Sequence, residues 1–541
     1  MGGVPGDGGG GSAKSFRRLN PRQRKKLAQA RVAPALPAAA AAAASMGVAA
    51  AGAEQGQRGT KRKAPGGGGA AQRGGGTPAG KRRASPSLPS PSPSRSRSRV
   101  PPSEARDPSE MYLEAPLRAP LVAEARQFFG ALGLGRDAFQ VRVGPTAGWR
   151  THAKLAVRAG PGGEKGAVCV GLFRPGSHDL VDLPSCPAHH PAVNAAVAEV
   201  KAGCAAVRAA GYEDVSGEGE LRYLCVNVER HSGKVQVGLV WNCEGRGAAG
   251  PALGALVAYL VESQSRGTMA LHSVWVNYHA PWKHSNAIFS REPGAWELRH
   301  GPGEVEERLR VRGCDLGVVL RFNPTVFRQA NLDAFAHVVS SVRRWVGEAR
   351  AGRGGKGAQG REPPRLLELY GGVGTIGLHA VDLVRSYVCS DENPSNAACF
   401  EAAAAGLPQA VLRRHRGGGT LRYVQEGASA MVASGAHLRA DVCVVDPPRK
   451  GLSDDVVAAL REARDAEGAA APLRRLIYVS CGFKAFRRDH RALTAGGHWS
   501  LVHAEGHVLF PGADQLETLA VFDRAPALDG GQDDDGFEWR I

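Results

Sequence analysis

From residue 365 onward, short apolar runs alternate with amphipathic stretches that have the length and spacing of helices. This alternation is typical of an α/β fold with a parallel, doubly wound sheet. The apolar runs predict seven strands, at residues 365–369, 386–391, 421–425, 441–446, 475–480, 499–504 and 517–523. The carboxyl ends of the first, second, fourth and fifth strands should meet in one crevice, where the strand order reverses. We therefore expect the functional groups at that edge of the sheet.

Residues 109–349 have a mixed pattern, in which strand-like alternation and helical periodicity follow one another without a regular order. The pattern predicts helices over 110–134, 190–210 and 251–265, and a last helix that ends near residue 345. It predicts strands at 139–143, 154–157, 168–173, 221–228, 235–240 and 273–277, of which 221–228 and 235–240 form an antiparallel pair. We interpret 109–349 as an α+β module that presents the substrate to a catalytic domain over 365–526.

Three further segments lack the apolar side chains of a folded core: 1–108, the Gly- and Arg-rich linker 350–364, and the acidic tail 527–541. The chain of 541 residues carries a formal charge of +18, of which residues 1–103 supply +17, so the body is almost neutral. A disordered basic tail of this kind is typical of an organelle transit peptide, the interpretation that we favour, or of a nuclear signal or RNA-binding arm.

The ten cysteines form no C-x-x-C pair and mostly lie inside apolar runs. This pattern indicates reduced thiols and gives no support to a zinc ribbon or a cysteine-ligated iron–sulfur cluster. No apolar run approaches the roughly 18 residues that a membrane span requires. We therefore expect neither a metal site nor a membrane segment.

A glycine-rich turn follows the first predicted strand of the catalytic domain. Gly372, Gly374 and Gly377 match G-x-G-x-x-G, and they should lead the chain into a helix. The second strand ends in Asp391, where a carboxylate would hold ribose hydroxyls. Glu368, just before the glycines, would repel a pyrophosphate but would suit a ligand with an ammonium and a sulfonium group. The charges thus favour S-adenosylmethionine over NAD.

The fourth predicted strand runs into Asp446, two prolines, Arg449 and Lys450. The prolines fix the backbone directly after a buried strand, so the Asp446 carboxylate should face the crevice. Arg449 and Lys450 remain available for a phosphate of the substrate.

Cys481 is the one cysteine of the ten at a predicted strand tip that faces the crevice. A nucleophilic thiolate needs partial exposure beside a positive charge or a base, and Arg449 and Lys450 are candidates for that charge. Glu517 begins the last predicted strand and should enter the rim of the same crevice.

Over about residues 140–523 the chain resembles the RNA uracil-5 methyltransferases of the class I S-adenosylmethionine-dependent fold. Five motifs in register carry the resemblance: Phe327-x-Gln329-x-Asn331, the run 367–374, Asp446-Pro-Pro-Arg-Lys-Gly451, Tyr478-Val-Ser-Cys481, and Phe510-Pro511 through Glu517. The segments 171–176 and 185–187 are similar to the family's central RNA-contacting module. The chain departs from the family pattern at Gly482-Phe483, where Asn-Pro is common, and at Gln515, where His is usual.

The resemblance implies a cofactor site lined by Gln329, Tyr370, Thr375, Asp391 and Asp446, with Cys481 as the nucleophile and Glu517 as the proton-transfer carboxylate. It implies methylation of uridine carbon 5 in tRNA or rRNA. A uridine in structured RNA must be splayed out to reach the crevice, so aromatic residues of the 109–349 module are expected to stack on it. Two alternatives stay open: a cytidine-5 methyltransferase, and a non-catalytic RNA-binding or folding factor. The sequence does not indicate the oligomeric state.

Overall fold

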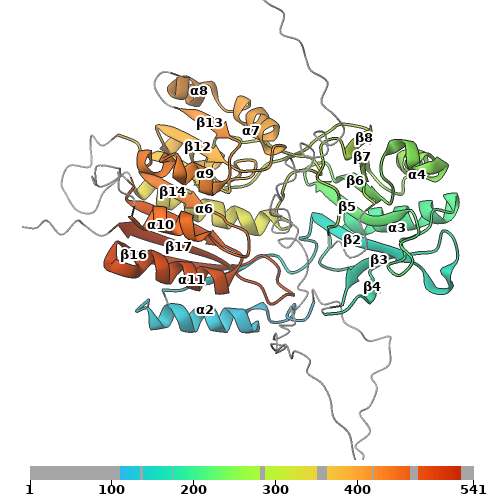
Figure 1. Ribbon diagram of the computed structural model, residues 1–541, viewed down its shortest axis with the longest axis horizontal. Helices are drawn as coiled ribbons and strands as arrows, with labels where there is room; N and C mark the ends of the chain where they lie inside the picture. The colour runs from blue at the N-terminus through green and yellow to red at the C-terminus, as the bar shows by residue number, and fades with distance from the viewer. Residues whose placement is uncertain are drawn as a thin grey trace, which may run out of the picture.

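The computed structural model describes residues 110–134, 138–174, 176–280, 287–349, 362–416, 420–462 and 473–524. The described part has two lobes that lie side by side, one built on an eight-stranded sheet and the other on a seven-stranded sheet (Figure 1). The predicted segments 1–108 and 527–541, and most of the linker, lie outside the described residues. No helix within the described ranges has both the length and the apolarity to cross a membrane.

The eight-stranded sheet has the order β1-β16-β17-β15-β14-β11-β12-β13. Its strands are β1 (Val141–Val143), β11 (Arg365–Leu369), β12 (Ser386–Ser390), β13 (Leu421–Val424), β14 (Val442–Val445), β15 (Arg475–Ser480), β16 (Trp499–Val508) and β17 (Glu517–Arg524). Every neighbouring pair is parallel except those of β17, which runs antiparallel to both β15 and β16. The strand order reverses between β11 and β14, as a doubly wound sheet requires.

Both faces of this sheet are buried. Successive residues of its central strands point to opposite sides, so each face contributes to a core of its own. Leu366, Val444 and Ile477 belong to one hydrophobic core, and Leu367, Val445 and Leu476 belong to another. The first core includes α6 (Leu332–Glu348), the 3-10 helix η7 (Gly377–Leu383) and α7 (Asn396–Ala405), and α8 (Gln409–Arg416) follows α7. The second includes α2 (Pro120–Ala131), α9 (Ala428–Ala433), α10 (Asp454–Glu462) and α11 (Phe483–Thr494). The result is three layers, α/β/α.

The first lobe extends beyond the predicted catalytic domain, so the boundary that we expected at 349/365 is wrong. β1 pairs with β16 through Val141↔Gly506, and α2 packs in the same core as α11. The two-stranded sheet of β9 (Val305–Glu307) and β10 (Leu320–Phe322) contributes to the core beneath α6. The separate second lobe is therefore shorter than 109–349 and spans from β2 (His152–Ala159) to β8 (Trp296–His300).

The second lobe is a seven-stranded sheet of order β4-β3-β2-β5-β6-β7-β8. It adds β3 (Val168–Phe173), β4 (Leu180–Asp182), β5 (Leu221–Glu229), β6 (Lys234–Trp241) and β7 (Leu271–Tyr278) to β2 and β8. The helices α3 (Pro191–Val207) and α4 (Gly250–Val261) pack with it in one core, and the short α5 (Ser263–Arg266) follows α4. The predicted antiparallel pair of β5 and β6 is confirmed.

The helix predicted over 110–134 is only partly confirmed. α2 begins at Pro120, and the 3-10 helix η4 (Pro116–Arg118) precedes it. Pro116 and Pro120 explain the break, because a proline has no N–H to donate and disfavours a helical conformation in the residue before it. The strands predicted at 139–143 and 154–157 are present, but they belong to different sheets.

A buried ion pair of the first lobe, with its contacts to β5 and Arg230, joins the two lobes. Arg328, which is 2% exposed, pairs with Glu307 of β9 and donates a hydrogen bond of 2.8 Å to the Val228 carbonyl oxygen of β5. Glu307 also pairs with Arg230, at 2.7 Å. Removing one partner of such a pair leaves an uncompensated buried charge.

We therefore expect Glu307→Gln to lower the free energy of unfolding by about 3–5 kcal/mol in urea titrations. The matched control is Glu306→Gln, since Glu306 pairs with Arg321 at the surface and its loss should cost no more than about 1 kcal/mol. Equal effects of the two substitutions would contradict a stabilising role for the buried pair.

Candidate active site

The glycine turn after β11 leaves open space beside its backbone. Gly372 and Gly374 have φ of 55° and 77°, in the left-handed region that favours glycine. Tyr370 also lies in this region, with φ of 60°. A Cβ added at Gly374 would come within 2.6 Å of the Phe400 ring, whereas one at Gly372 would meet no atom within 4 Å. The Gly374 side is thus packed and the Gly372 side is free for a ligand. The helix that follows is the 3-10 helix η7 rather than an α-helix.

The side chains of Asp391 and Glu368 accept hydrogen bonds from the backbone of this turn. Asp391 accepts hydrogen bonds from the backbone N–H groups of Gly372, at 3.1 Å, and Asn393, at 2.9 Å. Glu368, which is 1% exposed, accepts one from the Gly377 N–H at 3.1 Å and another from the Tyr387 hydroxyl. Asp391 thus orients the loop that would bind the ligand.

The carboxyl groups around the turn resist ionisation. Burial raises the pKa of Glu368 to about 8, and the nearby charges of Asp446 and Asp391 add to that rise. Burial, followed by the charge of Asp391, raises the pKa of Asp446 to about 7. Burial also raises the pKa of Asp391 itself. A cation placed among these three groups would relieve both the desolvation and the mutual repulsion.

The tip of β15 lies directly against the loop that follows β14. A Cβ added at Gly482 would overlap the carbonyl oxygen of Arg449, so only glycine fits between the two segments. This contact brings the half-buried Cys481 to the Asp446–Arg449 loop. Burial raises the pKa of the Cys481 thiol, the carboxyl groups of Glu517 and Asp446 raise it further, and Arg449 acts in the opposite direction.

The prediction that nearby positive charge activates Cys481 therefore needs correction. Arg449 does act on the thiol, but burial and two carboxyl groups outweigh it, so the surroundings of Cys481 favour the neutral thiol. Lys450 is exposed. A proton acceptor must therefore assist any nucleophilic attack by this sulfur.

Glu517 reaches the site because β17 runs against the direction of its neighbours. The pairing Ser480↔Thr518 sets the first residues of β17 beside the last residues of β15, so Glu517 lies near Cys481. Glu517 is 5% exposed, and its Oε1 has no hydrogen-bond partner among the described residues. Burial raises its pKa well above the ordinary value, with Asp446 adding to the rise and Arg449 opposing it.

The remaining predicted residues border this region. Thr375 is half-buried in the turn, and its carbonyl oxygen accepts a hydrogen bond from His379 at 2.7 Å. Gln329 is half-buried on the segment before α6, which Asn393 ties to the Asp391 loop through a 3.0 Å hydrogen bond to the Thr325 carbonyl oxygen. Asn331 caps α6 by accepting from the Ala334 N–H.

Tyr387 is a residue of this site that the sequence analysis missed. Its hydroxyl donates to Glu368, and a Cβ added at Gly377 would overlap its ring. The one available signal was a tyrosine in the middle of a predicted strand, because a buried tyrosine hydroxyl needs a hydrogen-bond partner.

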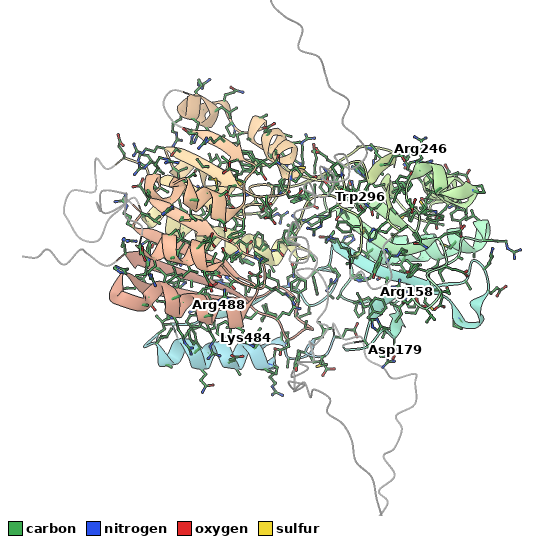
Figure 2. All side chains as sticks on the ribbon, in the orientation of Figure 1. Arg158, Asp179, Arg246, Trp296, Lys484 and Arg488 are labelled. Atoms are coloured by element: carbon green, nitrogen blue, oxygen red, sulfur yellow. The ribbon has the colours of Figure 1, made fainter. Side chains whose placement is uncertain are left out.

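Several aromatic residues of the second lobe contact an arginine. The Arg158 guanidinium lies over the rings of Phe173, Tyr212 and Tyr223, at 5.1, 5.2 and 5.3 Å from the centroids. Figure 2 shows Arg158 on this lobe and Lys484 and Arg488 on the other.

No group of His, Cys, Asp or Glu suited to a metal ion is found in the ranges that the structure describes.

Comparison with known proteins assigns the family, although no family model matches the chain. The chain is 34% identical over 384 residues to an uncharacterized RNA methyltransferase of Protochlamydia amoebophila, covering 70% of this chain and 87% of that one. The chain belongs to the RNA methyltransferases. This RNA methyltransferase is also 26% identical over 418 residues to the 23S rRNA (uracil(1939)-C(5))-methyltransferase RlmD of Verminephrobacter eiseniae, covering 73% and 74% of the two chains.

Among solved structures, the RNA methyltransferase is similar to the Pyrococcus abyssi tRNA (uracil-54, C5)-methyltransferase in complex with S-adenosyl-L-homocysteine. The TM-score is 0.49 at 19% identity, over 74% of this chain and 83% of that one. The predicted class I fold is confirmed by the order and direction of its own strands and by its family.

The raised pKa of Glu368 predicts a pH dependence of stability. The folded protein retains the Glu368 proton up to about pH 8, whereas an unfolded glutamate loses it near 4.5, so this group's contribution to stability falls as pH rises between those values. Relative to wild type, Glu368→Gln should therefore gain roughly 2–4 kcal/mol in unfolding free energy from pH 5 to pH 8.

The control for that measurement is Glu401→Gln, which changes an exposed glutamate of α7. Its difference from wild type should stay constant over the same pH range. Parallel pH profiles for wild type and Glu368→Gln would contradict the assignment of a neutral buried Glu368.

Proposed function

We propose that this RNA methyltransferase transfers the methyl group of S-adenosylmethionine to carbon 5 of a uridine in tRNA or rRNA. One observation carries the proposal: Cys481, Glu517 and the Asp446–Arg449 loop meet at the sheet edge where the glycine turn opens. A thiol and a buried carboxyl group at one crevice suit covalent activation of a pyrimidine ring. The similarity to RlmD, whose name specifies uracil carbon 5, supports the same substrate.

The residues around the turn fit this cofactor. Its ammonium and sulfonium groups carry positive charge, and it has no phosphate, so it suits the carboxyl groups of the buried Glu368 and the half-buried Asp391 and Asp446. The free space beside Gly372 lets the ligand approach the backbone. Gln329, Tyr370, Gly374 and Thr375 would complete the site. When bound, S-adenosylmethionine supplies an electrophilic methyl group.

Cys481 begins the reaction because carbon 5 of uracil is a poor nucleophile. The thiol loses its proton to an acceptor in the crevice, and Arg449 favours the resulting thiolate. A bond forms between Sγ and carbon 6, and the electron pair of the 5,6 double bond moves to carbon 5 with enolate character at oxygen 4. Carbon 5 then becomes the nucleophile for the methyl group, a step that depends on positioning.

Glu517 completes the reaction by accepting the proton of carbon 5. The electron pair of that C–H bond restores the double bond, and the bond between Sγ and carbon 6 breaks. The raised pKa of Glu517 makes its carboxylate a stronger base than an exposed glutamate. Gln515 stands where the family usually has a histidine, so we assign this proton transfer to Glu517 alone. Arg449 and Lys450 would bind phosphates of the RNA.

We further propose that the protein acts in an organelle. The support is the composition of residues 1–108, which are rich in Arg and Ser and poor in acids. A nuclear location is the alternative, since the same segment contains clusters of Lys and Arg.

The test is mass spectrometry of nucleosides from RNA incubated with the protein and isotopically labelled S-adenosylmethionine. We expect the label in 5-methyluridine with wild type and no label above background with Cys481→Ala, although calorimetry should give both proteins the same affinity for the cofactor. The control is Cys169→Ala, which changes a half-buried cysteine of β3 and should leave activity unchanged. Label in 5-methylcytidine instead would reject uridine as the substrate.

Glu517→Gln should slow turnover by about 10²–10⁴-fold, as expected for loss of a general base. Because the sulfur could then add but not leave, a covalent complex of protein and RNA should accumulate and be visible on denaturing gels. The double variant Cys481→Ala/Glu517→Gln should form no such complex. Rapid turnover without a trapped complex in Glu517→Gln would show that another group removes the proton.

A further inference from the structure

A groove lined by arginines lies on the α6 side of the first lobe. Its volume is about 1160 Å³, and its walls come from α6, η7, the segment 308–318 and residues of β1 and β16. Six arginines line it: Arg142, Arg308, Arg310, Arg312, Arg343 and Arg344. Glu505 is the single acid among the lining residues. Its carboxylate is already hydrogen-bonded to Nε2 of His507, at 3.1 Å.

Most of these arginines form no close ion pair within the described part of the chain. Arg142, Arg308, Arg310 and Arg312 are exposed, and none of their side chains pairs with an acid in the described part of the chain. Arg344 has only a distant pair with Glu348, at 3.9 Å between two half-exposed side chains. Surface arginines of a folded body usually alternate with acids, so this concentration exceeds what solubility requires.

Arg343 has a different role in the same groove. It is buried and binds both oxygens of Asp382, the His379 carbonyl oxygen at 2.7 Å and the Gly313 carbonyl oxygen at 2.8 Å. These contacts fasten the segment 308–318 and η7 to α6. The backbone N–H of Arg312 also donates a hydrogen bond to the Ser340 hydroxyl of α6, at 2.9 Å, and so holds the same segment against this helix. The exposed arginines therefore project from a fixed wall.

We propose that this groove binds the sugar-phosphate backbone of the RNA substrate, away from the uridine that is modified. The inference rests on the proposed function, since it assumes an RNA substrate. Arginine forms bidentate bonds with phosphate, and a row of uncommitted arginines suits a repeating polyanion better than a single small anion. Such contacts position a nucleic acid without reading its sequence.

The groove and the active site share one element. α6 has 17 residues, so it is about 25 Å long. Its first turn adjoins the active-site edge, since its cap Asn331 also donates to the Leu509 carbonyl oxygen just beyond β16. Its later residues, from His337 to Gly347, line the groove. RNA bound along α6 would thus be held at a fixed distance from Cys481. The folded part of the enzyme would then bind RNA in addition to any binding by the basic tail.

The test compares full-length wild type with Arg308→Gln/Arg310→Gln/Arg312→Gln for binding of an unmodified tRNA transcript at several salt concentrations. Each lost phosphate contact reduces the slope of log affinity against log salt by about 0.7–0.9. We expect a slope smaller by about 2 and an affinity at least about tenfold lower near physiological salt. Cofactor affinity should be unchanged, which reports an intact fold.

The matched control is Arg118→Gln/Arg126→Gln/Arg422→Gln, which removes the same charge from exposed arginines outside the groove. It should bind the transcript within about twofold of wild type, because its three arginines lie outside the groove. The two triple variants have the same net charge, so non-specific attraction cannot account for a difference between them. All three proteins retain the same basic tail, so the difference in slope reports the groove.

Wild-type slope and affinity in the groove variant, or equal losses in both triple variants, would overturn the proposal. The readout is binding, so it is separate from the chemistry. If the groove variant loses affinity but wild type places no label in 5-methyluridine, the groove assignment stands and the proposed reaction fails.

Discussion

The backbone pairing of β15 with β17 is the constraint on which the active site depends. β17 runs antiparallel within an otherwise parallel sheet, and its register sets Thr518 opposite Ser480. A parallel last strand would begin at the far edge and would carry Glu517 away from the crevice. Because β17 runs in reverse, the residue that begins it meets Cys481, the residue that ends β15. Two groups 36 positions apart thus come together through main-chain hydrogen bonds alone.

The cost of this arrangement is electrostatic. Glu368, Asp391, Asp446 and Glu517 gather at one edge of the sheet, and burial raises the pKa of each of them. Such a cluster weakens the ligand-free protein, because every ionised member loses hydration and repels the others. The ammonium and sulfonium groups of S-adenosylmethionine would reduce that penalty. The same burial keeps Cys481 neutral, which protects the thiol until substrate and a proton acceptor are present.

The local pattern of the sequence located the strands of the catalytic sheet to within a few residues, because both faces of its central strands are buried and their apolar runs are sharply bounded. It also identified the turn, the Asp446 loop and Cys481, since residues at the ends of parallel strands converge by topology. It predicted a strand at 139–143 but could not assign β1 to the catalytic sheet, because its three residues are at most half-buried and its partner, β16, lies about 360 positions later. It likewise gave no sign that Arg328 and Glu307 are buried, since burial of a charge follows from tertiary packing.

The central claim is that one pyrimidine ring contacts the Cys481 sulfur while its carbon 5 receives the methyl group. The most direct measurement uses RNA that contains 5-fluorouridine, in which carbon 5 carries fluorine where the base would remove a proton. After methyl transfer the base has no proton to take, so the sulfur cannot leave. Mass spectrometry of the digested complex should find one peptide, containing Cys481, that carries the fluorinated nucleotide plus one methyl group, and only when S-adenosylmethionine is supplied. An adduct on another residue, or a methylated RNA that never becomes attached to the protein, would contradict the account.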